Sequence, residues 1–133
     1  MEPLTFLASR KKNPITRLNS NSRIYKLIIK AIQEKKGENI ISLDLRKIPE
    51  AISDYFIVCE ATSTIQVKAI ADFVEETLKN ELGEKAYRHE GYNALHWVLI
   101  DYVNVVVHVM LPETRKFYKL EEMWSDAILQ EYN

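Results

Sequence analysis

Residues 54–66 of the chain, with the sequence DYFIVCEATSTIQ, decide its fold. The stretch opens with an unbroken apolar run over 55–59, which is typical of a central strand that is covered on both faces. Ser63 and Gln66 follow at the spacing of a capping box, and this spacing predicts that a helix starts directly after the strand. A buried strand followed at once by a helix indicates an α/β fold.

The sequence on either side of this stretch predicts a further alternation of helices and strands. Apolar residues at helical spacing predict one helix from residues 20–22 to Gly37, and another from Ser63 to Gly83. Further strands are expected over 40–45, 86–89, 97–102 and 105–111, and short helical pieces over 113–118 and 120–128. The predicted fold is therefore α/β, with a mixed sheet of about five strands covered by helices.

Composition and charge fit one globular domain that has no general affinity for nucleic acid. The 133 residues are 47% hydrophobic and 28% charged, and 18 basic residues oppose 19 acidic ones. Residues 1–20 are predicted to be a flexible basic tail, and 21–133 a single domain. The basic residues of this tail (Arg10, Lys11, Lys12 and Arg17) suggest, as an alternative, an arm that contacts RNA.

The location expected for the protein is the cytoplasm. No apolar run approaches the roughly 20 residues that cross a bilayer, and the N-terminus lacks the features of a signal peptide. Cys59 is the only cysteine, so an internal disulfide is excluded. The sequence therefore predicts no membrane contact.

Residues that commonly carry chemistry are sparse. Three glycines are too few for a phosphate-binding loop, and His89, His96 and His108 lack the spacing of a zinc motif. Cys59 lies inside the apolar run, where a thiol is usually inert. No catalytic residue, metal or cofactor is therefore expected.

Three aspartates leave an enzyme open as an alternative. Asp44, Asp54 and Asp101 lie at predicted strand ends, where they could meet to hold a metal for phosphoryl transfer, as in a divergent nucleotidyltransferase. The ordinary role of each is to accept a hydrogen bond in a cap or turn. The aromatic C-terminal residues suggest a third class, an adaptor or dimerisation module (Phe117, Tyr118 and Trp124).

The motifs, taken in order, resemble the ribosomal silencing factor family, whose plant namesake is Iojap. They are 54–58 (DYFIV), 61–63 (ATS), 89–91 (HEG), 97–102 (WVLIDY), 106–109 (VVHV) and 115–124 (RKFYKLEEMW). The resemblance covers about residues 22–126. It implies a fold related to that of nucleotidyltransferases, without their catalytic carboxylates, and a protein that binds rather than catalyses.

The resemblance also implies a partner and an effect. Family members bind the large ribosomal subunit through its ribosomal protein number fourteen, on the face that meets the small subunit. They thereby block subunit joining sterically and lower translation when nutrients are scarce. A role in large-subunit assembly and a homodimer are implied as well, and no cofactor is needed.

Five residues match family positions that are expected to bind the partner. Trp97 would be the aromatic anchor of the interface, and Asp101 would accept hydrogen bonds from basic groups of the partner. His108, Glu90 and Tyr118 match further positions, and His108 is expected to position Asp101 across the hairpin.

The chain departs from the family pattern at two turns. Ala61 replaces a glycine that usually precedes Thr-Ser, so the turn from strand to helix is expected to differ slightly. Val103-Asn104 replaces the usual Gly-Asp. Of these two residues, Asn104 accepts a left-handed conformation, whereas the β-branched Val103 resists it.

Overall fold

The structure is a computed structural model, and it describes residues 18–132. The predicted tail over 1–20 therefore lies outside the described residues, except for residues 18–20. Leu18 belongs to the folded part, since its backbone N–H donates to Oδ2 of Asp54 at 2.8 Å and its side chain packs on the core.

Within residues 18–132, six strands form one mixed sheet in the order β3-β4-β5-β2-β1-β6. The parallel pair is β2 with β5, and the other neighbours are antiparallel. The strands are β1 (Glu38–Asp44), β2 (Tyr55–Glu60), β3 (Arg88–Glu90), β4 (Trp97–Asp101), β5 (Val105–Met110) and β6 (Ile128–Tyr132). The predicted mixed sheet is confirmed, and β2 lies in its interior as its apolar run indicated.

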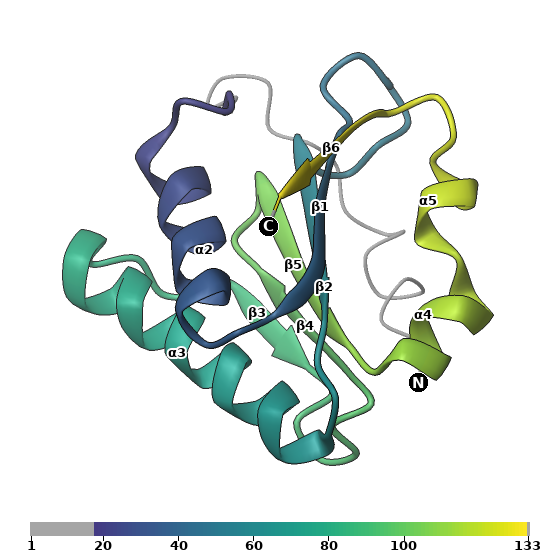
Figure 1. The fold of residues 1–133 in the computed structure, drawn as a ribbon. Helices are drawn as coiled ribbons and strands as arrows, with labels where there is room; N and C mark the ends of the chain where they lie inside the picture. Colours follow the sequence, from purple (N-terminus) through teal and green to yellow (C-terminus); the bar gives the residue numbers. More distant parts are fainter. Residues whose placement is uncertain (1–17, 133) are drawn as a thin grey trace.

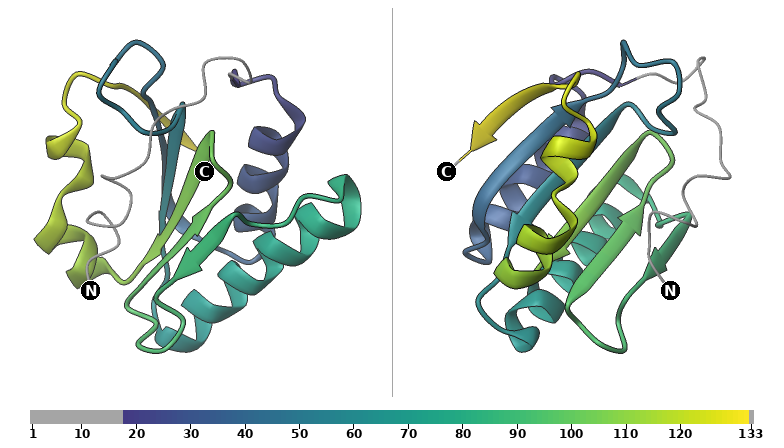
Figure 2. Two further views of the ribbon diagram at one scale, coloured as in Figure 1. Left: turned by 180° about the vertical axis from the view of Figure 1, so that it is seen from behind. Right: turned by 90° about the vertical axis from the view of Figure 1, so that its right-hand side faces the viewer.

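Helices cover both faces of this sheet (Figures 1 and 2). The longer helices, α2 (Arg23–Glu34) and α3 (Thr64–Leu82), pack on one face, while α4 (Pro112–Tyr118) and α5 (Leu120–Met123) lie on the other. Alternate residues of β2 enter the two resulting cores. Ile57 packs beneath α2 and α3, and Phe56 packs on the side of α4 and α5.

The capping box at the start of α3 is confirmed in part. Oγ of Ser63 accepts from the backbone N–H of Gln66 at 3.1 Å, as predicted. The side chain of Gln66 accepts from the N–H of Thr62 instead of that of Ser63. Ala61 adopts no left-handed backbone conformation, so the missing family glycine leaves this turn unstrained.

The two predictions about glycines at the helix ends have different outcomes. Gly83 ends α3 in the left-handed conformation, with φ of 66°, as predicted. At the end of α2 the left-handed residue is Lys36, with φ of 64°, and Gly37 follows it. Gly37 serves another need, because a Cβ there would collide with the side chain of Ile32.

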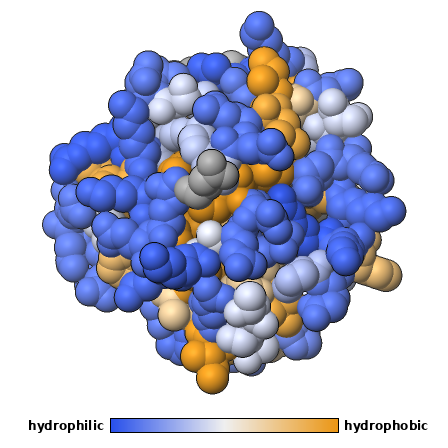
Figure 3. Space-filling model, in the orientation of Figure 1, coloured by the Kyte–Doolittle hydropathy of each residue, from blue (hydrophilic) through white to orange (hydrophobic). Residues whose placement is uncertain are grey.

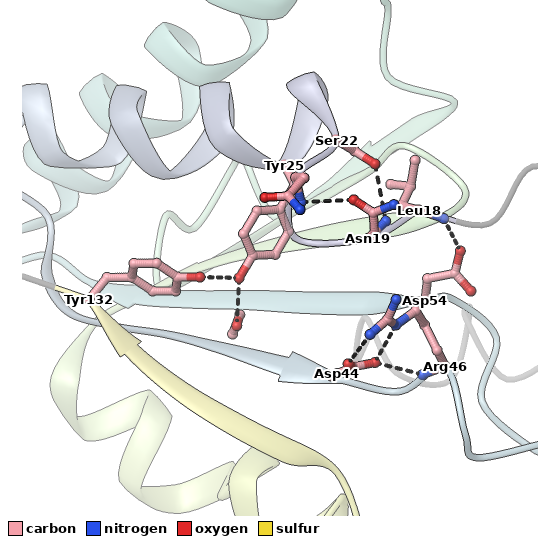
Figure 4. A network of polar contacts seen from close by, with 10 residues as sticks. Leu18, Asn19, Ser22, Tyr25, Asp44, Arg46, Asp54 and Tyr132 are labelled. Carbon is pink, nitrogen blue, oxygen red and sulfur yellow. Dashed lines mark hydrogen bonds and ion pairs between the residues drawn. The ribbon is translucent and has the colours of Figure 1, made fainter.

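The C-terminal strand corrects the prediction of a helix over 120–128. The helical part ends at Met123, and β6 begins at Ile128 and pairs antiparallel with β1. The hydroxyl of Tyr132 hydrogen-bonds that of Tyr25 on α2, which also donates to Ser42 on β1 at 2.8 Å (Figure 4). β6 is thus joined to both β1 and α2, and the sheet has six strands rather than five.

Candidate partner-binding site

The five predicted partner-binding residues lie on one face of the sheet. In the strand register, Leu99 opposes both Glu90 and His108, and residues directly opposite each other point to the same face. Trp97 and Asp101 alternate with Leu99 on β4 and therefore share that face. Tyr118 reaches it from α4, since its ring lies 4.7 Å from that of Trp97.

Burial divides these five residues into two groups. Trp97 is 6% exposed, and Asp101 and His108 are fully buried. Glu90 and Tyr118 are partly exposed. In this structure, Glu90 and Tyr118 are therefore the members that present substantial surface, and the other three lie beneath.

Trp97 and His108 hold each other across the β4–β5 hairpin. The indole N–H of Trp97 donates to Nδ1 of His108 at 3.0 Å, and the His108 ring packs 4.6 Å from Phe56. The bond corrects the expectation that His108 positions Asp101, because His108 contacts the tryptophan and lies opposite Leu99. A neutral ring that accepts at Nδ1 carries its proton on Nε2.

The environment keeps His108 neutral. Burial lowers the pKa of His108 to about 3, because the imidazolium would lose its hydration and no carboxylate compensates it. Protonation at Nδ1 would also set two donors against each other. Among the described residues, Nε2 of His108 has no hydrogen-bond partner.

Asp101 organises the turn that joins β4 to β5. Its Oδ1 accepts from the N–H of Val103 at 2.8 Å, and the N–H of Asn104 donates to the carbonyl of Tyr102 at 3.0 Å. Asn104 had been expected to adopt the left-handed conformation. The left-handed residue is instead Val103, with φ of 75°. A three-residue turn with this φ is rare and strained.

Gly91 positions Glu90 beside this hairpin. Gly91 has φ of 94°, and a Cβ there would collide with the carbonyl of Trp97. The connection from β3 to β4 therefore needs glycine at position 91, both for its conformation and for its close approach to β4.

The three aspartates of the enzyme alternative do not converge. Asp101 lies on the face of α4 and α5, whereas Asp44 opposes Tyr55 and lies on the face of α2. Each has a structural role. Asp44 binds the guanidinium of Arg46, and Asp54 accepts from the N–H of Leu18 (Figure 4). Asp101 accepts from the N–H of Val103 in its turn. No group of three or more potential metal ligands exists within residues 18–132.

Two further expectations concern the single cysteine and membrane-spanning segments. Cys59 is fully buried, and burial raises the pKa of its thiol to about 12, so the prediction of an inert core cysteine is confirmed. No helix among the described residues is long and apolar enough to cross a bilayer.

The predicted set of partner-binding residues left out two residues of α4 that the structure brings to attention. Phe117 is 76% exposed, and its ring lies 5.0 Å from that of Tyr118. Arg115 is only 8% exposed, and its guanidinium binds the carbonyl of Asn39 and the carboxylates of Glu60 and Glu121. Both residues belong to the 115–124 motif, but spacing alone could not tell the exposed aromatic from the packed ones.

Comparison with known proteins gives a consistent result. A family model described as "Ribosomal silencing factor during starvation" matches residues 19–133. The ribosomal silencing factor RsfS of Halalkalibacterium halodurans is 39% identical over 108 residues, which are 81% of this chain and 91% of that protein. A mouse protein named for mitochondrial assembly of the ribosomal large subunit is 30% identical over 68% of this chain and 41% of its own length. A crystal structure of a Chromobacterium violaceum protein superposes with a TM-score of 0.72 and 42% identity, covering 77% of this chain and 83% of that one.

Proposed function

The chain belongs to the ribosomal silencing factor family, which has a ribosome-associated regulatory role, and we propose from this membership how it acts. It binds the large ribosomal subunit through ribosomal protein number fourteen and occupies the face that meets the small subunit. Subunit joining is then blocked sterically, and translation falls when nutrients are scarce. The mechanism is occupancy, so it requires neither catalysis nor a cofactor, and it operates in the cytoplasm.

The observation that carries this proposal is a row of three packed aromatic rings, Phe117, Tyr118 and Trp97, which we call the aromatic step. Phe117 projects into solvent, packs on Tyr118, and Tyr118 in turn packs on the buried ring of Trp97. Aromatic residues in such a supported position dominate the energy of many protein interfaces. We assign direct contact to Phe117, Tyr118 and Glu90.

The three buried members of the site support these contacts from below. Trp97, held by His108, fixes the ring of Tyr118, and Asp101 fixes the hairpin that carries Trp97. The net charge of −1 gives no basic field for RNA, so a ribosomal protein is the better-matched partner.

Sedimentation with separated ribosomal subunits tests the proposal. Wild-type protein is expected to travel with the large subunit in a sucrose gradient and to reduce the fraction of joined ribosomes. Tyr118→Ala should weaken large-subunit binding by about thirtyfold, since loss of an interface anchor costs on the order of 2 kcal/mol. Ile65→Ala is the matched control, because Ile65 is 81% exposed on α3, on the opposite face of the sheet.

Three outcomes would contradict the proposal. Wild-type protein that stays at the top of the gradient would favour an adaptor or dimerisation module without ribosome contact. Unchanged subunit joining at saturating protein would refute the steric mechanism even if the large subunit were bound. Equal loss of binding in Tyr118→Ala and Ile65→Ala would show that the aromatic step is not the contact.

A further inference from the structure

Within residues 18–132, the strand β6 leaves one edge of the sheet unpaired. It pairs with β1 on one side, and it is the last strand in the sheet order. Residues 128–131 are exposed, and Ile128 and Leu129 are 61% and 47% exposed. β6 contains no proline or lysine and pairs with β1 without a bulge, so it lacks three of the devices that protect an edge strand. Its outer backbone groups can therefore pair with another strand.

A groove of about 1080 Å³ runs beside this edge, between β6 and the helices α4 and α5. Leu129 and Glu131 oppose Leu43 and Ile41, so both point to the face of the groove. Ile41 and Leu129 give the groove an apolar floor. In Figure 3, a strip of apolar surface runs from the upper right to the centre of the view, between hydrophilic side chains. Figure 1 has the same orientation, and β6 lies in front of β1 in this part of the molecule.

The charge of the groove indicates which kind of partner it binds. Its lining has five carboxylates and three cations, which gives a net charge of −2 (Glu38, Glu60, Glu121, Glu122 and Glu131 against Arg115, Lys116 and Lys119). Arg115 is committed to Glu60 and Glu121. The remaining carboxylates outnumber the two lysines, so basic side chains are favoured.

A second copy of the chain fits this edge poorly. Antiparallel pairing of β6 with its own copy, centred on Gln130, would place Leu129 opposite Glu131 twice. It would also bring two acidic grooves together, and like charges repel. The edge is better matched by a different strand.

We propose that β6 and its groove bind an extended peptide segment of a protein partner, with basic and apolar side chains in alternation. The segment adds to the sheet as a strand beside β6, and its basic side chains lie over Glu131 and Glu38. This surface goes beyond the proposed ribosome contact. Both involve α4, but Arg115 and Lys116 line the groove, whereas the contact residues Phe117, Tyr118 and Glu90 do not. The two surfaces can therefore be tested separately.

A synthetic hexapeptide of alternating lysine and valine is the probe. Titrated into the isotopically labelled full chain, it should shift the amide resonances of β6 and of residues 116–122 and slow hydrogen exchange in β6. A hexapeptide of alternating glutamate and valine should not bind at the same concentration. A lysine peptide that is N-methylated at every residue keeps its charge but cannot donate backbone hydrogen bonds, so it should also fail.

Paired charge reversals locate the site. Glu131→Lys should weaken binding of the lysine peptide by about tenfold, because it turns an attraction into a repulsion. Glu76→Lys makes the same change at an exposed position on α3 and should leave binding unaltered. Circular dichroism of both variants verifies that they fold.

Several results would overturn the proposal. They are absence of binding at millimolar peptide, equal binding of the N-methylated peptide, and equal effects of Glu131→Lys and Glu76→Lys. Slow exchange in β6 that depends on protein concentration without peptide would identify a second copy as the occupant instead. None of these results bears on ribosome binding, which the sedimentation experiment measures through α4.

Discussion

His108 should make the protein lose stability between pH 7 and pH 5. In the unfolded chain a histidine has a pKa of about 6.5, whereas burial lowers the pKa of His108 in the folded protein to about 3. Below pH 6.5 the His108 imidazole is therefore protonated in the unfolded state, while it stays neutral in the folded state. Acid then favours unfolding until the pH falls through about 3, where the folded state also takes up the proton.

The size of the effect follows from these two pKa values. Linkage over the interval from pH 7 to pH 5 gives a loss of about 2 kcal/mol in the free energy of unfolding. This is a measurable share of the roughly 5–15 kcal/mol that stabilises a typical domain. Asp44, whose pKa the Arg46 guanidinium lowers, contributes only at lower pH, because its carboxylate is ionised in both states above pH 5.

Urea unfolding at the two pH values, followed by tryptophan fluorescence, measures this loss. His108→Asn offers Trp97 an acceptor near the position of Nδ1 and cannot titrate, so the loss attributed to His108 should disappear in this variant. His96→Asn removes an exposed histidine and should keep the wild-type loss. If His108→Asn lost as much stability as the wild type, the account of a buried neutral histidine would be refuted.

Three further predictions concern single residues. Val103→Gly should stabilise the protein by about 1 kcal/mol in urea unfolding, because it relieves a β-branched residue at φ of 75°, and a loss of stability would contradict the strain. Arg115→Met should destabilise it by about 3 kcal/mol, since Glu60 and Glu121 lose their cation, and adding Glu60→Gln and Glu121→Gln should recover part of the loss in the same assay. Cys59 should react with a thiol reagent only through unfolding, at a rate that rises with urea, whereas fast labelling of the native protein would disprove its burial.

The sequence predicted best where one local pattern was enough. The apolar run in 54–66 and the capping pair Ser63 and Gln66 placed β2 and α3, because both signals concern neighbours in the chain. β6 was missed because its five residues are mostly exposed and carry no alternating pattern, so its pairing with the distant β1 determines it. The same limit applies to the left-handed Lys36, which depends on the packing of Gly37 against Ile32.

The candidate site shows the same division between local and distant information. The sequence indicated five residues, and the register of β3, β4 and β5 brings four of them to one face while α4 adds Tyr118. The hydrogen bond between Trp97 and His108 could not be predicted, because it requires the register of the hairpin. Burial of Trp97 and exposure of Phe117 likewise depend on where α4 packs.

The position of β6 has a consequence for how the chain is made. β1 emerges early from the ribosome that synthesises it, but the strand that covers its outer side, β6, is translated after the other five strands. Throughout that interval Ile41 and Leu43 lie on an uncovered strand, which is a template for wrong pairing with other nascent chains. A nascent chain that has not yet produced β6 therefore exposes this side of β1, and slower translation over 111–128 would lengthen that exposure.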